Sequence, residues 1–322
     1  MAIKLSPNLG HLVYGIAFLS AARLAFAQKK VLIYSYVAPG EFVHDSIPTA
    51  TQALISHGSS ISISFDSTQD PSQFTAQNLK NYDGLLFLMT IGEVLDSTQQ
   101  QAFRDYLDGG GNFIAVHAAS DCLRNTSWYG EEVGAYFDYH PELQNATVDV
   151  IDSSHPATSM LPAQWHVQDE MYNFKSDPRS IGAVVLLSAN DSSYNDPGPR
   201  KFNQGTPHPT AWYQEKGAGV ESNGTAGRSF YTSLGHLSST WQDDLFLSHI
   251  LGGVQWAVEA TASTNTSSSA SSTASASASA TSASSAADSS SPASQSSGTQ
   301  LGSMGMWATS LLSALGALVF VP

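Results

Sequence analysis

Continuous apolar runs punctuate the first half of the chain and predict buried β-strands. Three such runs lie at 31–37, 85–89 and 112–116, and residues 61–65 alternate between apolar and polar positions. Uninterrupted runs rich in Val, Ile, Leu and Phe are typical of strands that are buried on both faces of a sheet. The pattern therefore predicts four strands, three of them fully buried.

Two amphipathic helices are predicted between these strands. The first has Asp45 as its N-cap, places Ile47, Ala50, Ala53 and Leu54 on one face, and ends at Gly58. The second begins where Ser97 and Gln100 have capping-box spacing, and it stops at glycines 109–111. Strands that alternate with helices predict βαβ units, and hence an α/β fold with a mostly parallel sheet covered on both faces.

The pattern becomes looser beyond about residue 140. Strand-like stretches occur at 146–151, 181–188, 210–214 and 228–234, and a final helix is expected at 243–258. Residues 28–260 are thus predicted to form one α/β domain.

The N-terminal residues 1–27 have the pattern of a secretory signal. Lys4 precedes an apolar stretch at 12–22, and Ala25-Phe26-Ala27 resembles a cleavage site. The alternative is a membrane anchor, but a spanning helix needs about 20 apolar residues and this run is shorter.

The C-terminal residues change character after Ala260. In the segment 261–297, 33 of the 37 residues are Ser, Thr or Ala. Such a composition predicts a disordered, O-glycosylated stalk. Residues 298–322 end in a hydrophobic tail, and small residues precede it, so Ser296 or Ser297 is the expected attachment site of a GPI anchor. The alternative is an ordinary tail-anchored helix.

Five N-glycosylation sequons agree with passage through the secretory pathway. Their acceptor residues are Asn125, Asn145, Asn190, Asn223 and Asn265. Together with the two ends, they predict a secreted protein that is tethered to the outer face of the plasma membrane or to the cell wall.

Composition narrows the function classes further. Only 12% of residues are charged, and 27 acidic residues outnumber 13 basic ones. An acidic surface argues against nucleic acid as a partner. A single cysteine excludes a disulfide scaffold and a cysteine-rich metal site.

Three histidines follow predicted strands. His44 comes after the first strand, His117 directly after the fourth, and His236 after the stretch at 228–234. Open parallel sheets bind ligands at the carboxyl ends of their strands. If the last of these strands is also parallel, the three imidazoles share one crevice.

Other polar residues are weaker candidates for chemistry. Ser120 lies at a strand-to-helix turn but lacks the flanking glycines of a nucleophile elbow, and Cys122 is interpreted as a small buried thiol. Asp169 and Glu170 are adjacent, so in an extended segment they point to opposite faces and cannot form the facing carboxylate pair of a glycosidase.

A divalent metal is a further candidate cofactor. His117 and Asp121, with His44 or His140, offer suitable ligand types, although their spacing matches no metal motif. No glycine-rich phosphate-binding motif is present, so a bound nucleotide is not expected.

Several of these segments, taken together, resemble the ThuA-like family, which is named for trehalose utilisation. They occur in the family's order at 41–47, 109–121, 128–131 with His140-Pro141, 155–157, 169–174, 208–212, 227–236 and 251–256. The resemblance implies a flavodoxin-like three-layer sandwich similar to class I glutamine amidotransferases. Those enzymes carry a nucleophilic cysteine at the turn that here reads His117-Ala118-Ala119, so glutamine hydrolysis is not expected. The resemblance also implies a substrate among disaccharides, including sugars oxidised to keto forms.

The resulting hypothesis is an enzyme that acts on a carbohydrate at the cell surface. His117 would serve as general base or acid, because an imidazole titrates near neutral pH, and Asp121 or Glu170 would orient it. His44 and His236 would polarise substrate oxygens.

Aromatic and further polar residues would bind the sugar. The candidates are Tyr172, Trp212, Trp241, His140 and His208. Two alternatives stay open: a non-catalytic protein that binds glycans or has a structural role in the cell wall, and a metal-dependent hydrolase.

Overall fold

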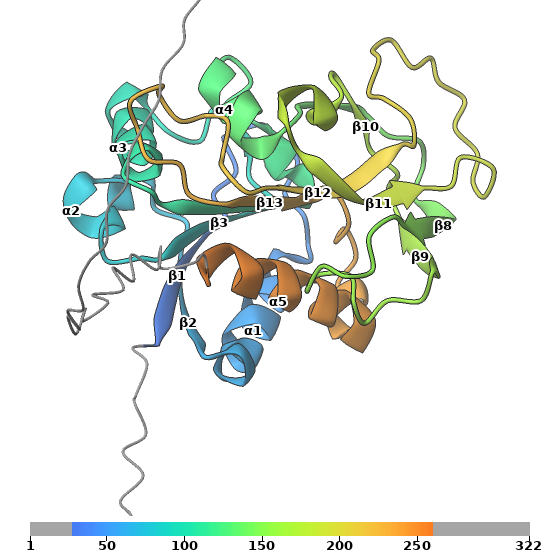
Figure 1. Cartoon of the computed structure of the whole chain (residues 1–322), viewed down its shortest axis with the longest axis horizontal. Helices are drawn as coiled ribbons and strands as arrows, with labels where there is room; N and C mark the ends of the chain where they lie inside the picture. Colours follow the sequence, from blue (N-terminus) through green and yellow to red (C-terminus); the bar gives the residue numbers. More distant parts are fainter. Residues whose placement is uncertain (1–27, 260–322) are drawn as a thin grey trace, which may run out of the picture. The chain divides into compact units, whose positions relative to one another are not determined.

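A nine-stranded sheet runs through residues 28–259, the part of the chain that the computed structural model describes. Its strands lie in the order β2-β1-β3-β5-β13-β12-β11-β8-β9 (Figure 1). The strands of this sheet are β1 (Lys29–Tyr34), β2 (Ile63–Thr68), β3 (Gly84–Leu88), β5 (Asn112–Val116), β8 (Gln144–Val150), β9 (Gln164–Asp169), β11 (Val184–Ala189), β12 (Pro209–Gln214) and β13 (Ser229–Thr232). The short pairs are β4 (Ile91–Gly92) with β6 (Asp121–Cys122) and β7 (Phe137–Tyr139) with β10 (Asn173–Phe174).

Five neighbouring strands form the parallel part of the sheet. β1 pairs in parallel with β2 and β3, and β5 pairs in parallel with β3 and β13. Counting only these strands in chain order, the sequence across the sheet is 2-1-3-4-5, which is the flavodoxin-like order. The predicted α/β fold with a mainly parallel central sheet is confirmed.

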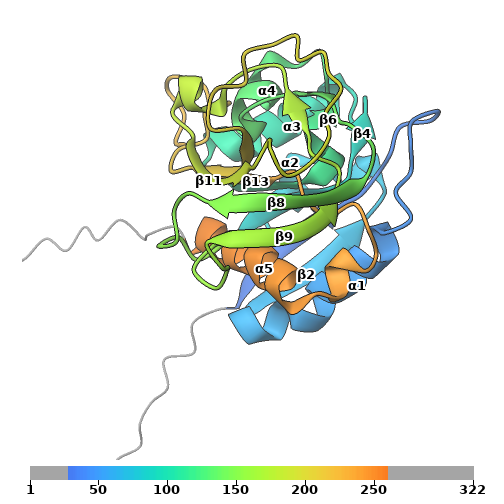
Figure 2. The same cartoon turned by 90° about the vertical axis from the view of Figure 1, so that its right-hand side faces the viewer.

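The remaining strands extend this sheet with antiparallel pairs, visible at the near side in Figure 2. β12 pairs with β13 and β11, and β8 pairs with β11 and β9, all antiparallel. The sequence pattern predicted β8, β11 and β12 as strands but missed β9. The reason is that β9 exposes its first residue and buries only Trp165 and Asp169, so it carries no continuous apolar run.

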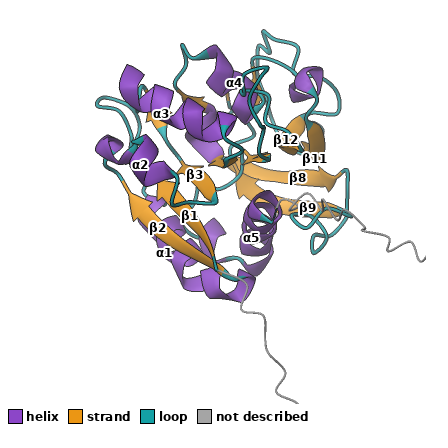
Figure 3. Ribbon diagram, turned by 60° about the vertical axis from the view of Figure 1, so that its left-hand side comes forward, coloured by secondary structure: helices purple, strands orange, loops and turns teal. Residues whose placement is uncertain are grey.

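Helices cover both faces of the sheet (Figures 1 and 3). The helices are α1 (Ile47–His57), α2 (Ala76–Leu79), α3 (Ser97–Asp108), α4 (Ser127–Val133) and α5 (Asp244–Val258). Alternate residues of β1 show the division: Val31 and Ile33 belong to the core under α1 and α5, whereas Leu32 and Tyr34 belong to the core under α2, α3 and α4. The three-layer arrangement follows from this two-sided burial.

The helix starts differ from the prediction by one residue. The capping box of α3 is formed by Asp96 and Gln99, because the Asp96 side chain accepts from the Gln99 amide (2.9 Å) and the Gln99 side chain accepts from the Asp96 amide (2.8 Å). For α1 the N-cap is Ser46, which makes no capping bond; its buried hydroxyl donates to the sulfur of Met89 instead. α3 ends at Gly109, as predicted.

The two predicted targeting segments and the stalk lie outside the described residues. The same holds for Asn265 and for Ser296 and Ser297. Four sequons lie among the described residues: Asn125, Asn145 and Asn223 are exposed, and Asn190 is partly buried. No helix between residues 28 and 259 combines the length and the apolar character that crossing a bilayer requires.

Candidate functional site

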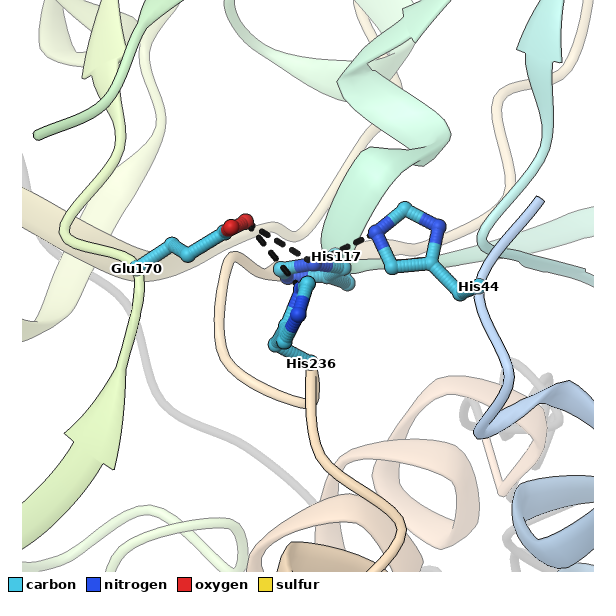
Figure 4. A group of neighbouring side chains, drawn as sticks. All are labelled: His44, His117, Glu170 and His236. Carbon is cyan, nitrogen blue, oxygen red and sulfur yellow. Dashed lines mark hydrogen bonds and ion pairs between the residues drawn. The ribbon is translucent and has the colours of Figure 1, made fainter. Parts of the chain in front are cut away.

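Four polar side chains converge at one edge of the sheet. His44 follows β1, His117 follows β5, His236 follows β13 and Glu170 follows β9. β9 runs in the same direction as the parallel strands because an even number of antiparallel pairings separates it from β13. Carboxyl ends of all four strands therefore meet at the same edge, and Figure 4 shows the side chains pointing toward one another. We call His44, His117, Glu170 and His236 the histidine cluster.

His117 lies at the centre of the histidine cluster. Its backbone has a φ of 56°, in the left-handed region, at the sharp turn after β5, and its side chain is fully buried. A non-glycine residue in this region is strained and persists only where its surroundings hold it. The Nδ1 atom lies 2.6 Å from the carbonyl oxygen of Ser233, which can only accept, so Nδ1 carries the proton and Nε2 presents its lone pair.

The lone pair of His117 faces two further groups. His44 Nε2 lies 3.1 Å from His117 Nε2, and the hydroxyl of Tyr172 also lies 3.1 Å from it. Burial lowers the pKa of His44 to about 4 and lowers the pKa of His117 well below the usual value for an imidazole. Both rings are accordingly neutral at physiological pH.

Glu170 supplies the negative charge of the histidine cluster. Its Oε2 atom lies 3.2 Å from His236 Nδ1, 3.5 Å from His140 Nε2 and 3.7 Å from His117 Nε2. The contact with this carboxylate raises the pKa of His236 above its usual value. One carboxylate oxygen thus lies within 3.7 Å of three imidazole rings.

Asp169, unlike the adjacent Glu170, binds backbone amides. Its buried carboxylate accepts the Gly235 amide at 2.7 Å and the Glu170 amide at 2.9 Å. Burial raises its pKa to about 7, although these amides oppose the shift. The two adjacent carboxylates do not form a facing pair: Asp169 anchors the loop that carries His236, and Glu170 faces the imidazoles.

An aromatic residue that the sequence reasoning missed lies beside the histidine cluster. Phe42 is 62% exposed, its ring centre is 4.8 Å from that of His44, and it stacks at 6.4 Å on His236 with an interplanar angle of 11°. Its position two residues before His44, in a loop after a strand, was the available signal. An exposed ring beside buried polar groups is a suitable platform for the apolar face of a sugar.

Asp121 does not join the histidine cluster, contrary to its predicted part. Its carboxylate binds Arg124 at 2.7 and 2.8 Å, and Arg124 also binds Glu41 at 2.7 Å. This ion-paired arrangement occupies the carboxylate, so Asp121 neither orients His117 nor completes a metal site with it.

The two tryptophans predicted to bind substrate are core residues. Trp212 is 1% exposed and donates to the carbonyl of Val133, and Trp241 is 2% exposed and donates to the carbonyl of Gly235. Neither ring has a face left for a sugar. Their indole N–H groups are instead satisfied inside the fold.

The other predicted contacts lie around Tyr172. His140, about one-third exposed, stacks on Tyr172 with ring centres 5.5 Å apart and is at the rim of the histidine cluster. His208 lies behind it, with Nε2 at 2.8 Å from the Tyr172 carbonyl and Nδ1 at 2.8 Å from Asp191. His208 therefore positions Tyr172 and makes no contact with the cluster itself.

Ser120 and Cys122 take no part in the histidine cluster. The Ser120 hydroxyl is buried and lies 2.8 Å from that of Tyr231. Burial raises the pKa of the Cys122 thiol to about 12, so the thiol is protonated. The interpretation of Cys122 as a small buried thiol agrees with this environment.

A cavity of about 910 Å³ lies at the opposite edge of the sheet. It is lined by residues at the amino ends of the parallel strands, including Lys29, Asp83, Asn112 and Arg228. No member of the histidine cluster lines it. Ligands of open α/β sheets bind at the carboxyl ends of strands, so the histidine cluster, and not this cavity, is the candidate functional site.

Fold and site together define a flavodoxin-like α/β protein with a buried histidine–carboxylate site at the carboxyl edge of its parallel strands. The family model for trehalose utilisation, ThuA, matches residues 30–257. The chain therefore belongs to the ThuA family, as the ordered segments of the sequence suggested.

Solved structures support the fold at low sequence identity. A putative ThuA-like protein from Bacteroides uniformis is 21% identical, with a TM-score of 0.57 over 74% of this chain and 94% of that one. A putative ThuA-like protein from Parabacteroides merdae is 17% identical, with a TM-score of 0.52 over 72% of this chain and 90% of that one. No curated protein matches the sequence.

Proposed function

We propose that this protein is an enzyme that acts on a carbohydrate, a disaccharide or its keto derivative, at the histidine cluster. The observation that carries the proposal is the convergence of three imidazoles and one carboxylate within 4.8 Å, from four separate strand ends. Burying polar groups without full hydrogen bonding is unfavourable, by about 1–3 kcal/mol for each group. Clusters of buried titratable groups with perturbed pKa values are typical of functional sites.

The surroundings of the cluster support a sugar as the substrate. Phe42 offers an exposed ring beside His236, and Tyr172 and His140 add a hydroxyl and an imidazole that can exchange hydrogen bonds with sugar hydroxyls. The family's description, trehalose utilisation, points to the same substrate class. In this proposal the imidazoles polarise sugar oxygens, and protons move within the cluster during hydrolysis or elimination.

The test uses the full-length protein and a panel of disaccharides and their keto derivatives. We expect turnover of at least one of these sugars, and we expect its loss when both His117 and His236 are replaced by Ala. His166→Ala is the matched control, because His166 is an exposed histidine whose side chain, among residues 28–259, makes a hydrogen bond with Thr147 alone. Full activity in the double variant would refute the assignment of the site.

Binding without turnover would support the alternative, a non-catalytic protein that binds glycans. The exposed ring of Phe42 favours this alternative specifically, because a stacking platform needs no acid–base chemistry. Calorimetry with the same panel would show saturable binding while no product forms.

We also propose that the protein is secreted and held at the cell surface by a GPI anchor. The support is the sequence pattern of residues 1–27 and 298–322, together with the exposure of the sequons at Asn125, Asn145 and Asn223. Phospholipase C that is specific for phosphatidylinositol should release the protein from membranes, and an N-glycosidase should lower its mass. Retention after phospholipase treatment, with no mass shift, would contradict this part of the proposal.

A further inference from the structure

We propose that His44, His117, His236 and Glu170 bind one divalent transition-metal ion, with zinc as the ion that best suits the donors. The inference adds a cofactor to the site of the proposed function and rests on that function for its catalytic meaning. The binding itself rests only on the geometry of the four side chains.

The spacing of the donor atoms fits a metal ion. One ligand atom from each of the four residues lies within 4.8 Å of the others. Zinc binds nitrogen and oxygen ligands at about 2.0–2.2 Å, so neighbouring donors around a tetrahedral ion lie roughly 3.3 Å apart. The observed separations are 3.1 Å between His44 and His117, 3.2 Å between His236 and Glu170, and 3.7 Å between His117 and Glu170.

The hydrogen-bond inventory of His117 also favours a cation. Its Nδ1 proton is used by the Ser233 carbonyl, so Nε2 has one lone pair and no proton. That atom nevertheless has three polar neighbours, His44 Nε2, the Tyr172 hydroxyl and the Glu170 carboxylate, and its lone pair can accept a proton from one donor only, such as the Tyr172 hydroxyl. A lone pair that faces a carboxylate oxygen is repelled by it, and a cation between the two atoms turns this repulsion into attraction.

One ring nitrogen that faces the carboxylate of the cluster, Nδ1 of His236, is buried without a hydrogen bond in the part of the chain that the structure describes. Nδ1 of His44 also has no partner among the described residues, but His44 meets His117 through its other ring nitrogen, Nε2. For His236 the Glu170 oxygen is 3.2 Å away, yet it lies in the wrong direction for a hydrogen bond to the ring. Two groups that are close but misaligned for a hydrogen bond fit a third atom that both of them contact.

The outer contact of His117 matches that of a metal-binding histidine. Such histidines usually donate their second ring N–H to a backbone carbonyl or a carboxylate, which fixes the tautomer. His117 does so to Ser233, and Asp169 fixes the His236 loop through the Gly235 amide.

The donor set selects the class of ion. Three imidazole nitrogens and one carboxylate oxygen suit zinc and its first-row neighbours, whereas magnesium and calcium prefer oxygen donors. These donors differ from the metal ligands predicted from the sequence, which included Asp121 and His140. The Asp121 carboxylate is paired with Arg124, and His140 lies at the rim of the cluster beside Glu170. When bound, the ion would act as a Lewis acid, in place of the three imidazoles, toward a sugar carbonyl or hydroxyl oxygen that becomes its fifth ligand.

The test is direct metal binding to the full-length protein, prepared without a histidine tag and stripped with a chelator. Calorimetry with zinc chloride should give one site per chain, and elemental analysis of unstripped protein should give about one equivalent of a first-row metal. Absence of binding at millimolar zinc, with the protein folded by circular dichroism, would overturn the proposal.

Variants locate the site. Glu170→Gln and His44→Ala should each lower zinc affinity by about 10- to 100-fold or more, whereas His166→Ala should leave it unchanged. Glu170→Gln preserves side-chain shape, so it keeps the test decisive if His44→Ala does not fold. Equal affinity of Glu170→Gln and the wild type would contradict the site.

Activity measurements separate this inference from the proposed function. Turnover by protein that holds no metal would refute a role for the ion and leave the carbohydrate activity intact. One tightly bound ion with no turnover of any sugar would support the metal site and refute the enzyme.

Discussion

The buried carboxyl group of Glu132 makes the free energy of unfolding depend on pH. This residue of α4 is 1% exposed, and its carboxylate receives one hydrogen bond, from the Gly219 amide at 3.1 Å, among the contacts of the described residues. The chain passes so close that a Cβ at Gly217 would lie 2.3 Å from the carboxylate oxygens. Burial therefore raises the pKa of Glu132 from 4.5 to about 8.

The direction of the effect follows from proton linkage. The folded state holds the proton more tightly than the unfolded state, so the stabilisation is fully present below pH 4.5 and is lost as the pH rises through 8. The rise of the pKa from 4.5 to about 8 corresponds to about 5 kcal/mol in total, since a tenfold change in an equilibrium constant equals about 1.4 kcal/mol. Between pH 5 and pH 9 the loss amounts to about 4 kcal/mol.

The assay compares the wild type with Glu132→Gln, which cannot ionise. Urea denaturation at several pH values gives the free energy of unfolding of each protein, and the difference between them removes the contribution of every other titrating group. We expect the wild type to lose about 4 kcal/mol relative to the variant between pH 5 and pH 9. A difference that stays constant over this range, or changes in the opposite direction, would refute the assignment of a buried, protonated Glu132.

Two further substitutions and one labelling reaction test the placement of individual residues. Trp212→Ala should lower the free energy of unfolding by about 3–5 kcal/mol, because it empties a core position, and should leave the sugar affinity of the remaining folded protein unchanged; a selective loss of affinity would contradict its core role. Phe42→Ala should change stability by less than about 0.5 kcal/mol and weaken sugar binding by about tenfold, measured by calorimetry; unchanged affinity would remove Phe42 from the site. Cys122, whose pKa is about 12, should resist iodoacetamide in the native protein and react after denaturation, as followed by mass spectrometry; rapid labelling of the native protein would show that the thiol is not buried.

The parallel half of the fold was predictable because its signals are local. Strand β5 coincides with the predicted run at 112–116, and α3 ends at Gly109 as expected. Buried strands between helices need uninterrupted apolar sequence, and that requirement can be read one segment at a time. The antiparallel half was less predictable, since β9 is mostly solvent-exposed and its direction depends on three other pairings.

The site was predictable in part for the same reason. His44, His117 and His236 follow parallel strands, so the rule about carboxyl ends places them together. The position of Glu170 depends on the direction of β9, which no local pattern determines. The sequence alone indicated a carboxylate beside His117 but left both Asp121 and Glu170 as candidates. In the structure Asp121 is paired with Arg124, and Glu170 is the carboxylate near His117.

The aromatic residues show what tertiary packing decides. Trp241 lies between two polar residues and Trp212 between Ala211 and Tyr213, yet both rings are almost completely buried. Phe42 lies exposed beside two histidines. Whether a ring faces solvent depends on what covers it, and the covering segments are distant in sequence. No periodicity within 208–212 or 41–47 contains that information.

A crystal structure with a bound keto-disaccharide tests most directly whether the histidine cluster is the functional site. We expect sugar density against Phe42, with a sugar oxygen about 3 Å from the cluster formed by His44, His117, Glu170 and His236. Density in the cavity at the opposite edge of the sheet, beside Lys29 and the other residues at the amino ends of the strands, would contradict it.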